Sequence, residues 1–381
     1  MRLFKPAFLA FIALGFVVSP TPLWAFFYYA GLAPLTLAVL WRCHRQIQWR
    51  DPMLVLLLAC ILWFALTLTW GVNQSPALVR KYGNAAVTNT LFLLGGLVFF
   101  HHDNKDWREW ALGWLPLAGA VNVVIALFRH FVIHANGLET RMLGWAETRQ
   151  EILGASIIAV IAIVALRNLA MGRGAGGRLL QAGCLVLCLL FVALSGSRGP
   201  GVALACAAGL YLLLVRPRLL LPVTLVLGAS VMAFYVYSSS AFFALMENLQ
   251  RPSMRMEIWS RTLDYVAQRP FAGHGLASVN TFGETWITFP HSMYFSALYY
   301  GGAVGLGLVV AVFALALWRA VRLPEHHDRA FLLALLTIPL LAGATDTGQF
   351  IKPPSPQWYI VWLPLIVATA FTLPRAAGLP R

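Results

Sequence analysis

The stretch CLVLCLLFVALSGSRGPGVALACAAGLYLLLV, residues 184–215, decides the fold. It consists of two apolar runs, 184–194 and 201–215, joined by the short segment SGSRGP. Each run is about long enough to approach one crossing of a bilayer, whose hydrocarbon core is ~30 Å thick. Arg198 is the one charged side chain in the stretch. The pattern predicts two membrane-spanning helices whose joint places a guanidinium where membrane and water meet.

The composition extends this prediction to the whole chain. Of the 381 residues, 60% are hydrophobic and 11% are charged, whereas soluble domains carry about 25% charged residues. We expect an all-α polytopic membrane protein with a single integral membrane domain over residues 1–381. The first apolar run opens like a signal peptide, but no clear small-x-small cleavage site follows, so we expect a retained helix. About twelve transmembrane helices are predicted, at residues 4–19, 23–41, 52–70, 84–100, 110–133, 151–169, 179–195, 200–215, 218–237, 292–318, 329–345 and 356–373.

Lysine and arginine set the expected orientation, because cytoplasmic loops of membrane proteins carry an excess of them. Here the excess falls on the segments that share a side with the N-terminus. We therefore expect both termini in the cytoplasm and the Arg198 joint on the opposite side. The net charge of +14 is then largely an orientation signal that faces anionic lipid. Nucleic-acid binding is not expected, because the charge is scattered over short loops.

One predicted connection, residues 238–291 between helices nine and ten, is far longer than the others. Long loops in compact proteins usually carry function. Within this loop, MRMEIWSRTLDYVAQ (254–268) has the apolar spacing of an amphipathic helix, with Met254, Ile258 and Trp259 or Thr262 on one face. Such a helix can lie at the membrane surface. The following RPFAGHG, 269–275, predicts a turn-rich break.

External basic residues oppose the cytoplasmic excess and are therefore candidates to bind an anion. Arg198 is the strongest candidate, because Ser and Gly beside it leave backbone N–H groups for a phosphate and a helix begins there with its positive dipole end. Pro200 suits the first turn of that helix. The alternative is that these cations extend to lipid headgroups. The other basic candidates are Arg80, Lys81, Arg141, Arg251 and Arg255.

His291 lies at the end of the long loop, where the next helix is predicted to begin. Histidine exchanges protons near neutral pH, so on the same side as Arg198 it is a candidate general base. The alternative is an interfacial, hydrogen-bonded histidine. The external carboxylates form no tight acidic pair of the kind that holds a divalent ion on a diphosphate. No metal and no cofactor is expected, and arginine is expected to supply the positive charge.

Three segments in order carry a resemblance to a known family: SGSRGP (195–200), RMEIWSRTLDYVAQRPFAGHG (255–275) and PHSMYFSALYYGGAVGL (290–306). Together they resemble the O-antigen ligase and polymerase superfamily of bacterial surface-polysaccharide enzymes. The resemblance covers roughly the third of the chain from 190 to 310, and RMLG (141–144) is a weaker echo of an external segment in that family. The family often has Asn after the histidine, where this chain has Ser292.

The resemblance implies a substrate and a place. The donor would be a glycan on a polyprenyl diphosphate, handled at the periplasmic face of the bacterial inner membrane among membrane lipids. The acceptor in the ligases is a sugar hydroxyl of the lipid A–core. Arg198 and Arg255 would bind the diphosphate, and His291 would accept the proton of the attacking hydroxyl. The long loop would then be periplasmic.

Other functions remain open at this point. A polymerase that joins repeat units, or an enzyme that transfers the glycan to protein hydroxyls, would carry the same segments. A transporter that moves a lipid-linked glycan belongs to a different class. Transporters often show internal repeats and midplane sites, whereas we find no convincing repeat and the candidate polar groups lie at one face.

Overall fold

The computed structural model describes residues 3–101, 105–172, 174–222, 253–282 and 287–373, together with residues 224, 225, 229, 232, 236 and 243. Every regular element within these residues is helical. The main helices are α1 (Phe4–Val17), α2 (Thr21–Phe27), α3 (Ala33–Cys43), α4 (Pro52–Leu66), α5 (Pro76–His101), α6 (Lys105–Phe128), α7 (Glu151–Met171), α8 (Ala175–Leu194), α9 (Arg198–Val215), α12 (Arg255–Gln268), α13 (Met293–Val321), α14 (His326–Thr345) and α15 (Leu363–Thr372). Short 3₁₀ or π turns are η1 (Tyr28–Leu32), η2 (His44–Gln46), η3 (Thr67–Thr69), η4 (Arg129–Ile133), η5 (Ala146–Thr148), η6 (Pro217–Leu219) and η7 (Trp358–Trp362).

Nine helical spans among the described residues are long and apolar enough to cross a membrane, which fits a multi-pass membrane protein. Two shorter apolar helices, Phe4–Val17 and Trp358–Thr372, match two more predicted spans. The expected span 218–237 lies mostly outside the described residues, so the count of twelve stays a prediction. One helix boundary differs clearly from the sequence expectation. Helix α5 begins at Pro76 rather than near residue 84. Hydropathy marks only the apolar part of a helix, whereas the helix itself continues through the polar residues before it.

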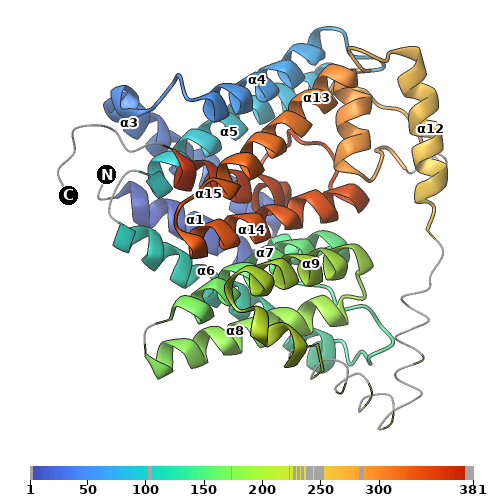
Figure 1. The fold of residues 1–381 in the computed structure, drawn as a ribbon. Helices are drawn as coiled ribbons and strands as arrows, with labels where there is room; N and C mark the ends of the chain where they lie inside the picture. The colour runs from blue at the N-terminus through green and yellow to red at the C-terminus, as the bar shows by residue number, and fades with distance from the viewer. Residues whose placement is uncertain are drawn as a thin grey trace.

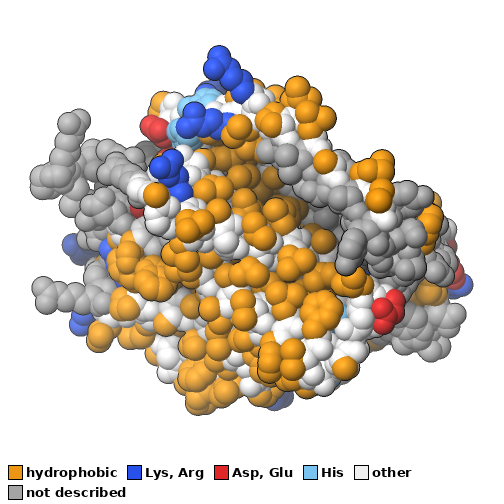
Figure 2. All heavy atoms as spheres, turned by 90° about the horizontal axis from the view of Figure 1, so that it is seen from below, with side chains coloured by type: hydrophobic (Ala, Val, Ile, Leu, Met, Phe, Trp, Pro, Cys, Tyr) orange, Lys and Arg blue, Asp and Glu red, His pale blue; other side chains and the backbone are white. Residues whose placement is uncertain are grey.

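The bundle is apolar on its outside as well as in its core. Large apolar side chains such as Val121 and Val124 of α6 and Val186 of α8 are about half or more exposed. Figure 2 shows one face on which apolar side chains are nearly continuous and Lys and Arg side chains lie toward the margin. Lipid tails are as apolar as these side chains, so such a surface is stable in a bilayer. Helix α7, by contrast, is buried along most of its length.

Helix α12 lies across one end of the bundle, roughly perpendicular to most of the long helices, as Figure 1 shows. Helix α9 packs extensively along α14, and both contact the buried α7. The start of α9 and the end of α14 therefore meet at the end of the bundle that α12 covers. This meeting point positions the candidate site.

Helix α13 is broken at Gly302, which has a φ of 65° that favours glycine. The predicted break RPFAGHG docks against this point. The N–H groups of His274 and Gly275 donate to the carbonyls of Tyr299 and Tyr300, and the N–H of Ala303 donates to Pro270. Backbone groups released by the kink are thus paired with the segment that follows α12. Helix α12 is tied to the middle of α13 in this way.

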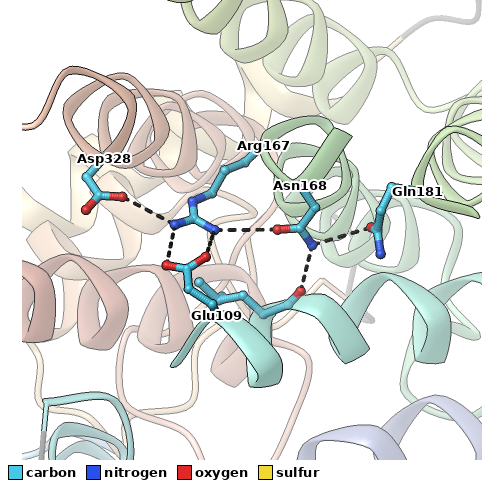
Figure 3. A network of polar contacts seen from close by, with 6 residues as sticks. Glu109, Arg167, Asn168, Gln181 and Asp328 are labelled. Carbon is cyan, nitrogen blue, oxygen red and sulfur yellow. Dashed lines mark hydrogen bonds and ion pairs between the residues drawn. The ribbon is translucent and has the colours of Figure 1, made fainter. Parts of the chain in front are cut away.

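A cluster of polar side chains joins helices at the other end of the bundle (Figure 3). The fully buried Arg167 of α7 donates to both carboxylate oxygens of Glu109 on α6, at 2.7 and 2.8 Å. It also donates to Asp328 of α14 at 3.3 Å. Beside it, Asn168 donates to the Leu112 carbonyl of α6 and to Gln181 of α8. Four helices are joined where α7 ends and α14 begins.

Candidate active site

The turn between α8 and α9 is built by its serines and glycine. Ser195 ends α8 and is fully buried. Gly196 follows with a φ of 59°, in the left-handed conformation that commonly ends helices. Ser197 then occupies the N-cap position, and Arg198 is the first residue of α9. Pro200 falls in the first helical turn, as expected. The side chain of Arg198 is exposed at this helix start.

Arg141, which precedes α7, holds this turn with its guanidinium group. Its Nε donates to the Ser195 carbonyl at 2.8 Å, and its Nη2 donates to the Ser197 hydroxyl at 2.9 Å. Its Nη1 lies 3.9 Å from Glu151 at the start of α7. The sequence suggested a substrate-binding residue, and this stays a prediction, because the guanidinium is hydrogen-bonded within the protein and also lines the cavity described below. Arg141 therefore braces the Arg198 turn.

Helix α12 forms at the expected residues and brings in Arg255. Ile258 and Thr262 form its buried side, as predicted, whereas Met254, which was expected on the same face, is the exposed N-cap residue. Arg255 begins the helix, and its Nε donates to the Thr345 carbonyl at 2.7 Å. Thr345 is the last residue of α14, where the carbonyls lack partners within the helix and attract a cation. Arg255 thus joins α12 to the end of α14.

His291 precedes α13 with a φ of 51°, a strained backbone for a residue other than glycine. Its Nδ1 lies 2.8 Å from Oδ1 of Asp346, the residue that follows α14. An ionised carboxylate only accepts hydrogen bonds, so this contact assigns the proton to Nδ1 and leaves Nε2 able to accept another. Phe289 stacks on the imidazole with ring centroids 3.9 Å apart. The ring is held on two sides.

Neighbouring residues fix the chain on either side of His291. Trp259 of α12 donates from Nε1 to the Pro290 carbonyl at 3.2 Å. Ser292 is the N-cap of α13, and its hydroxyl accepts from the Phe295 N–H. Serine and asparagine serve comparably as N-caps. The replacement of the family's Asn by Ser292 therefore keeps the cap of the helix.

These side chains line one cavity of about 330 Å³. Arg141, Arg198, Arg255, His291 and Asp346 line it. Apolar walls come from Ile152, Ile258 and Ile287. Three arginines and a histidine–aspartate pair thus share a space large enough for a diphosphate and part of a sugar.

Other sequence candidates lie elsewhere. Arg80 and Lys81 are exposed on the first turns of α5 and do not line the cavity. Arg251 lies outside the described residues.

The sequence did not single out two residues near the base. Asp346 lies 55 positions after His291, and no local pattern links the two. Lys352 lies beyond it and is partly buried. Burial and, to a smaller extent, the nearby Lys81 lower the pKa of Lys352 to about 8, although Asp346 acts in the opposite direction. A lysine with a lowered pKa beside a candidate base is a signal of a functional site. The sequence alone does not carry this signal, because it depends on burial and on neighbours that only the fold brings together.

Comparison with known proteins bears on the same part of the chain. Residues 183–310 match the family model described as O-antigen ligase, and that range holds Arg198, Arg255 and His291. The resemblance to the O-antigen ligase superfamily is confirmed. A protein of Pseudomonas aeruginosa named O-antigen ligase is 25% identical over 343 residues, covering 87% of this chain and 80% of that protein. The similarity to an O-antigen ligase thus extends well beyond the matched domain, over residues that include much of the bundle.

Proposed function

We propose that this O-antigen ligase-like protein is a glycosyltransferase. It transfers a glycan from a polyprenyl diphosphate to a sugar hydroxyl of the lipid A–core, at the periplasmic face of the inner membrane. The observation that carries the proposal is the single cavity shared by the His291–Asp346 pair, Arg198 and Arg255. The family match and the name of the Pseudomonas aeruginosa relative support a ligase over a polymerase or a protein glycosylation enzyme.

The chemistry needs one base and one cluster of positive charge. The acceptor hydroxyl oxygen attacks the anomeric carbon of the donor glycan, and its proton passes to Nε2 of His291. Asp346 holds the opposite ring nitrogen and stabilises the imidazolium that forms. The bond between the anomeric carbon and the diphosphate oxygen breaks, and the electron pair stays on the lipid diphosphate.

The arginines meet the charge that develops on this leaving group. Arg198 stands at the positive end of α9, where backbone N–H groups also face an anion. A guanidinium offers two parallel hydrogen bonds to phosphate oxygens. Arg255 adds a second cation from α12. In this proposal the arginines supply the electrostatic stabilisation, and no metal ion is needed.

Reconstitution tests the proposal directly. Purified protein in liposomes is supplied with polyprenyl-diphosphate-linked glycan and lipid A–core, and the joined product is measured by mass spectrometry. The wild type is expected to form the product and His291→Ala to lose it. His134→Ala is the matched control, because His134 is an exposed histidine that does not line the cavity.

Three outcomes would contradict the proposal or part of it. A wild-type protein that moves the donor across the bilayer without joining it to an acceptor would support the transporter. Product that consists only of lengthened donor chains would support the polymerase. Normal transfer by His291→Ala would remove His291 from the mechanism.

A further inference from the structure

Lys352 is fixed in place by its backbone. Its carbonyl accepts hydrogen bonds from Asn89 of α5 at 2.5 Å and from the indole of Trp358 in η7 at 3.2 Å. Asn89 is buried, and Trp358 is part of the aromatic core. The direction in which the lysine side chain leaves the backbone is therefore set by two rigid helices rather than by a free loop.

The side chain reaches the face of Phe289. Its Nζ lies 5.5 Å from the centroid of that ring, within the range of a cation–π contact. Phe289 in turn stacks on His291, with 30° between the ring planes. A Cβ at Gly348 would lie 3.4 Å from both Nζ and the Phe289 ring, so the chain passes closely beside the contact. Ammonium, phenyl ring and imidazole form a continuous stack.

Lys352 and His291 are also linked electrostatically, through Asp346. Asp346 is the hydrogen-bond partner of His291, and it also stabilises the cationic form of Lys352. Lys81 of α5 faces Lys352 as a like charge. Burial and Lys81 both oppose the cation, as its lowered pKa shows. The ammonium group of Lys352 thus lies in an environment that disfavours its charge. It lies beside Phe289 and Asp346, the two side chains that contact His291.

We propose that Lys352 is a positioning residue for His291, which holds Phe289 against the imidazole and shares the Asp346 carboxylate. The inference rests on the proposed role of His291 as the base. A cation beside Asp346 offsets part of the negative charge that His291 faces, so removing this cation strengthens the attraction between Asp346 and a protonated imidazole. The guanidinium groups that line the same cavity, Arg141, Arg198 and Arg255, are present in the wild type and the variant alike. Lys352 does not line the cavity, and therefore acts through these neighbours rather than on the substrate.

The test uses the full-length protein in liposomes with Lys352→Met, Lys352→Arg and the matched control Arg261→Met. Arg261 is an exposed cation on α12 that pairs with Glu257 and does not line the cavity. The pH dependence of turnover is measured from pH 5.5 to 8. In Lys352→Met the acid limb is expected to move to higher pH, with turnover at pH 6.5 reduced about three- to tenfold and donor KM changed less. Lys352→Arg and Arg261→Met are expected to keep the wild-type midpoint.

A second readout needs no turnover. The rate at which diethylpyrocarbonate modifies His291, followed by mass spectrometry of its peptide, reports how much of the imidazole is neutral at each pH. Its midpoint is expected to move in the same direction in Lys352→Met. Lys352→Gln serves the same test if the Met variant does not insert. Phe289→Leu, which removes the ring and keeps both charges, is expected to lower turnover with an unmoved midpoint.

The outcomes separate the two proposals. An inactive wild type would contradict the glycosyltransferase, while the modification profile would still test the coupling of Lys352 to His291. A Lys352→Met profile equal to the wild type in both readouts would overturn the positioning role. So would a Lys352→Arg variant as strongly shifted as Lys352→Met, because the effect would then not follow the charge.

Discussion

Replacing Asp346 by Asn tests the histidine–aspartate pair with little change of shape. The Asp346 side chain is only 12% exposed and its Oδ1 lies 2.8 Å from Nδ1 of His291. A hydrogen bond to a charged group contributes about 1.5–3 kcal/mol. If Asp346 exerts this effect on the imidazolium in the transition state, Asp346→Asn should lower turnover by about 10- to 150-fold. An amide that turns its N–H₂ toward Nδ1 would also favour the wrong tautomer and enlarge the loss.

The assay is turnover of the reconstituted protein at saturating donor and acceptor, with donor binding measured separately. Donor affinity is expected to change much less than turnover, because Asp346 acts on the base. Glu257→Gln is the matched control, since Glu257 is an exposed acid on α12 paired only locally with Arg261. An Asp346→Asn enzyme within threefold of the wild type at pH 7 would refute the reasoning.

Further predictions concern the arginines, the buried lysine and the membrane topology. Arg198→Lys should lower turnover by about 30- to 1,000-fold, because an ammonium cannot form the paired hydrogen bonds of a guanidinium and about 2–4 kcal/mol of transition-state stabilisation is lost. Separate assays of turnover and donor binding check this. The pKa of Lys352 is lowered to about 8, so below pH 8 the cost of burying its charge is fully present, and the folded protein gains stability as the pH rises from about 8 toward 10.5. Lys352→Met should therefore raise the thermal midpoint in detergent at pH 7, with a difference that shrinks toward pH 10.5. Arg167→Met removes the fully buried cation that the partly exposed carboxylates of Glu109 and Asp328 share, and should cost about 1.5–3 kcal/mol of stability, measured by thermal denaturation. Arg178→Met on an exposed part of α8 is the control. A cysteine at Ser253, an exposed residue that lines the same cavity as Arg198, in a protein without native cysteines should react with a membrane-impermeant thiol reagent from the periplasmic side. Labelling from the cytoplasmic side alone would contradict the orientation.

The helices were largely predictable because each carries its own signal. Helix α12 was expected over 254–268 from apolar spacing alone, and it forms at Arg255–Gln268. The start of α5 was not, since Arg80 and Lys81 lie on a helical segment that is too polar to be recognised by hydropathy. Helix continuity there depends on backbone hydrogen bonds and on neighbours, not on membrane burial.

The candidate site was predictable only in part. Arg198 and His291 could be singled out because each is a chemically distinctive side chain at the edge of an apolar run. The pairing of His291 with Asp346 depends on how α13 packs against α14, and no local pattern encodes such a distant contact. The same holds for Arg141, whose engagement with Ser195 and Ser197 reaches across more than fifty residues.

The contacts of α12 make the spacing of its residues a determinant of the geometry of the candidate site. Arg255 donates a hydrogen bond to the last carbonyl of α14, and Trp259 donates one to the carbonyl of Pro290, just before His291. Four helical residues, or about 6 Å, therefore fix the distance between the two attachment points. One inserted residue would turn Trp259 by about 100° about the helix axis and aim it away from Pro290. The separation between Arg255 and His291, to which the proposed mechanism assigns the diphosphate and the proton, is thus set by the register of one short helix.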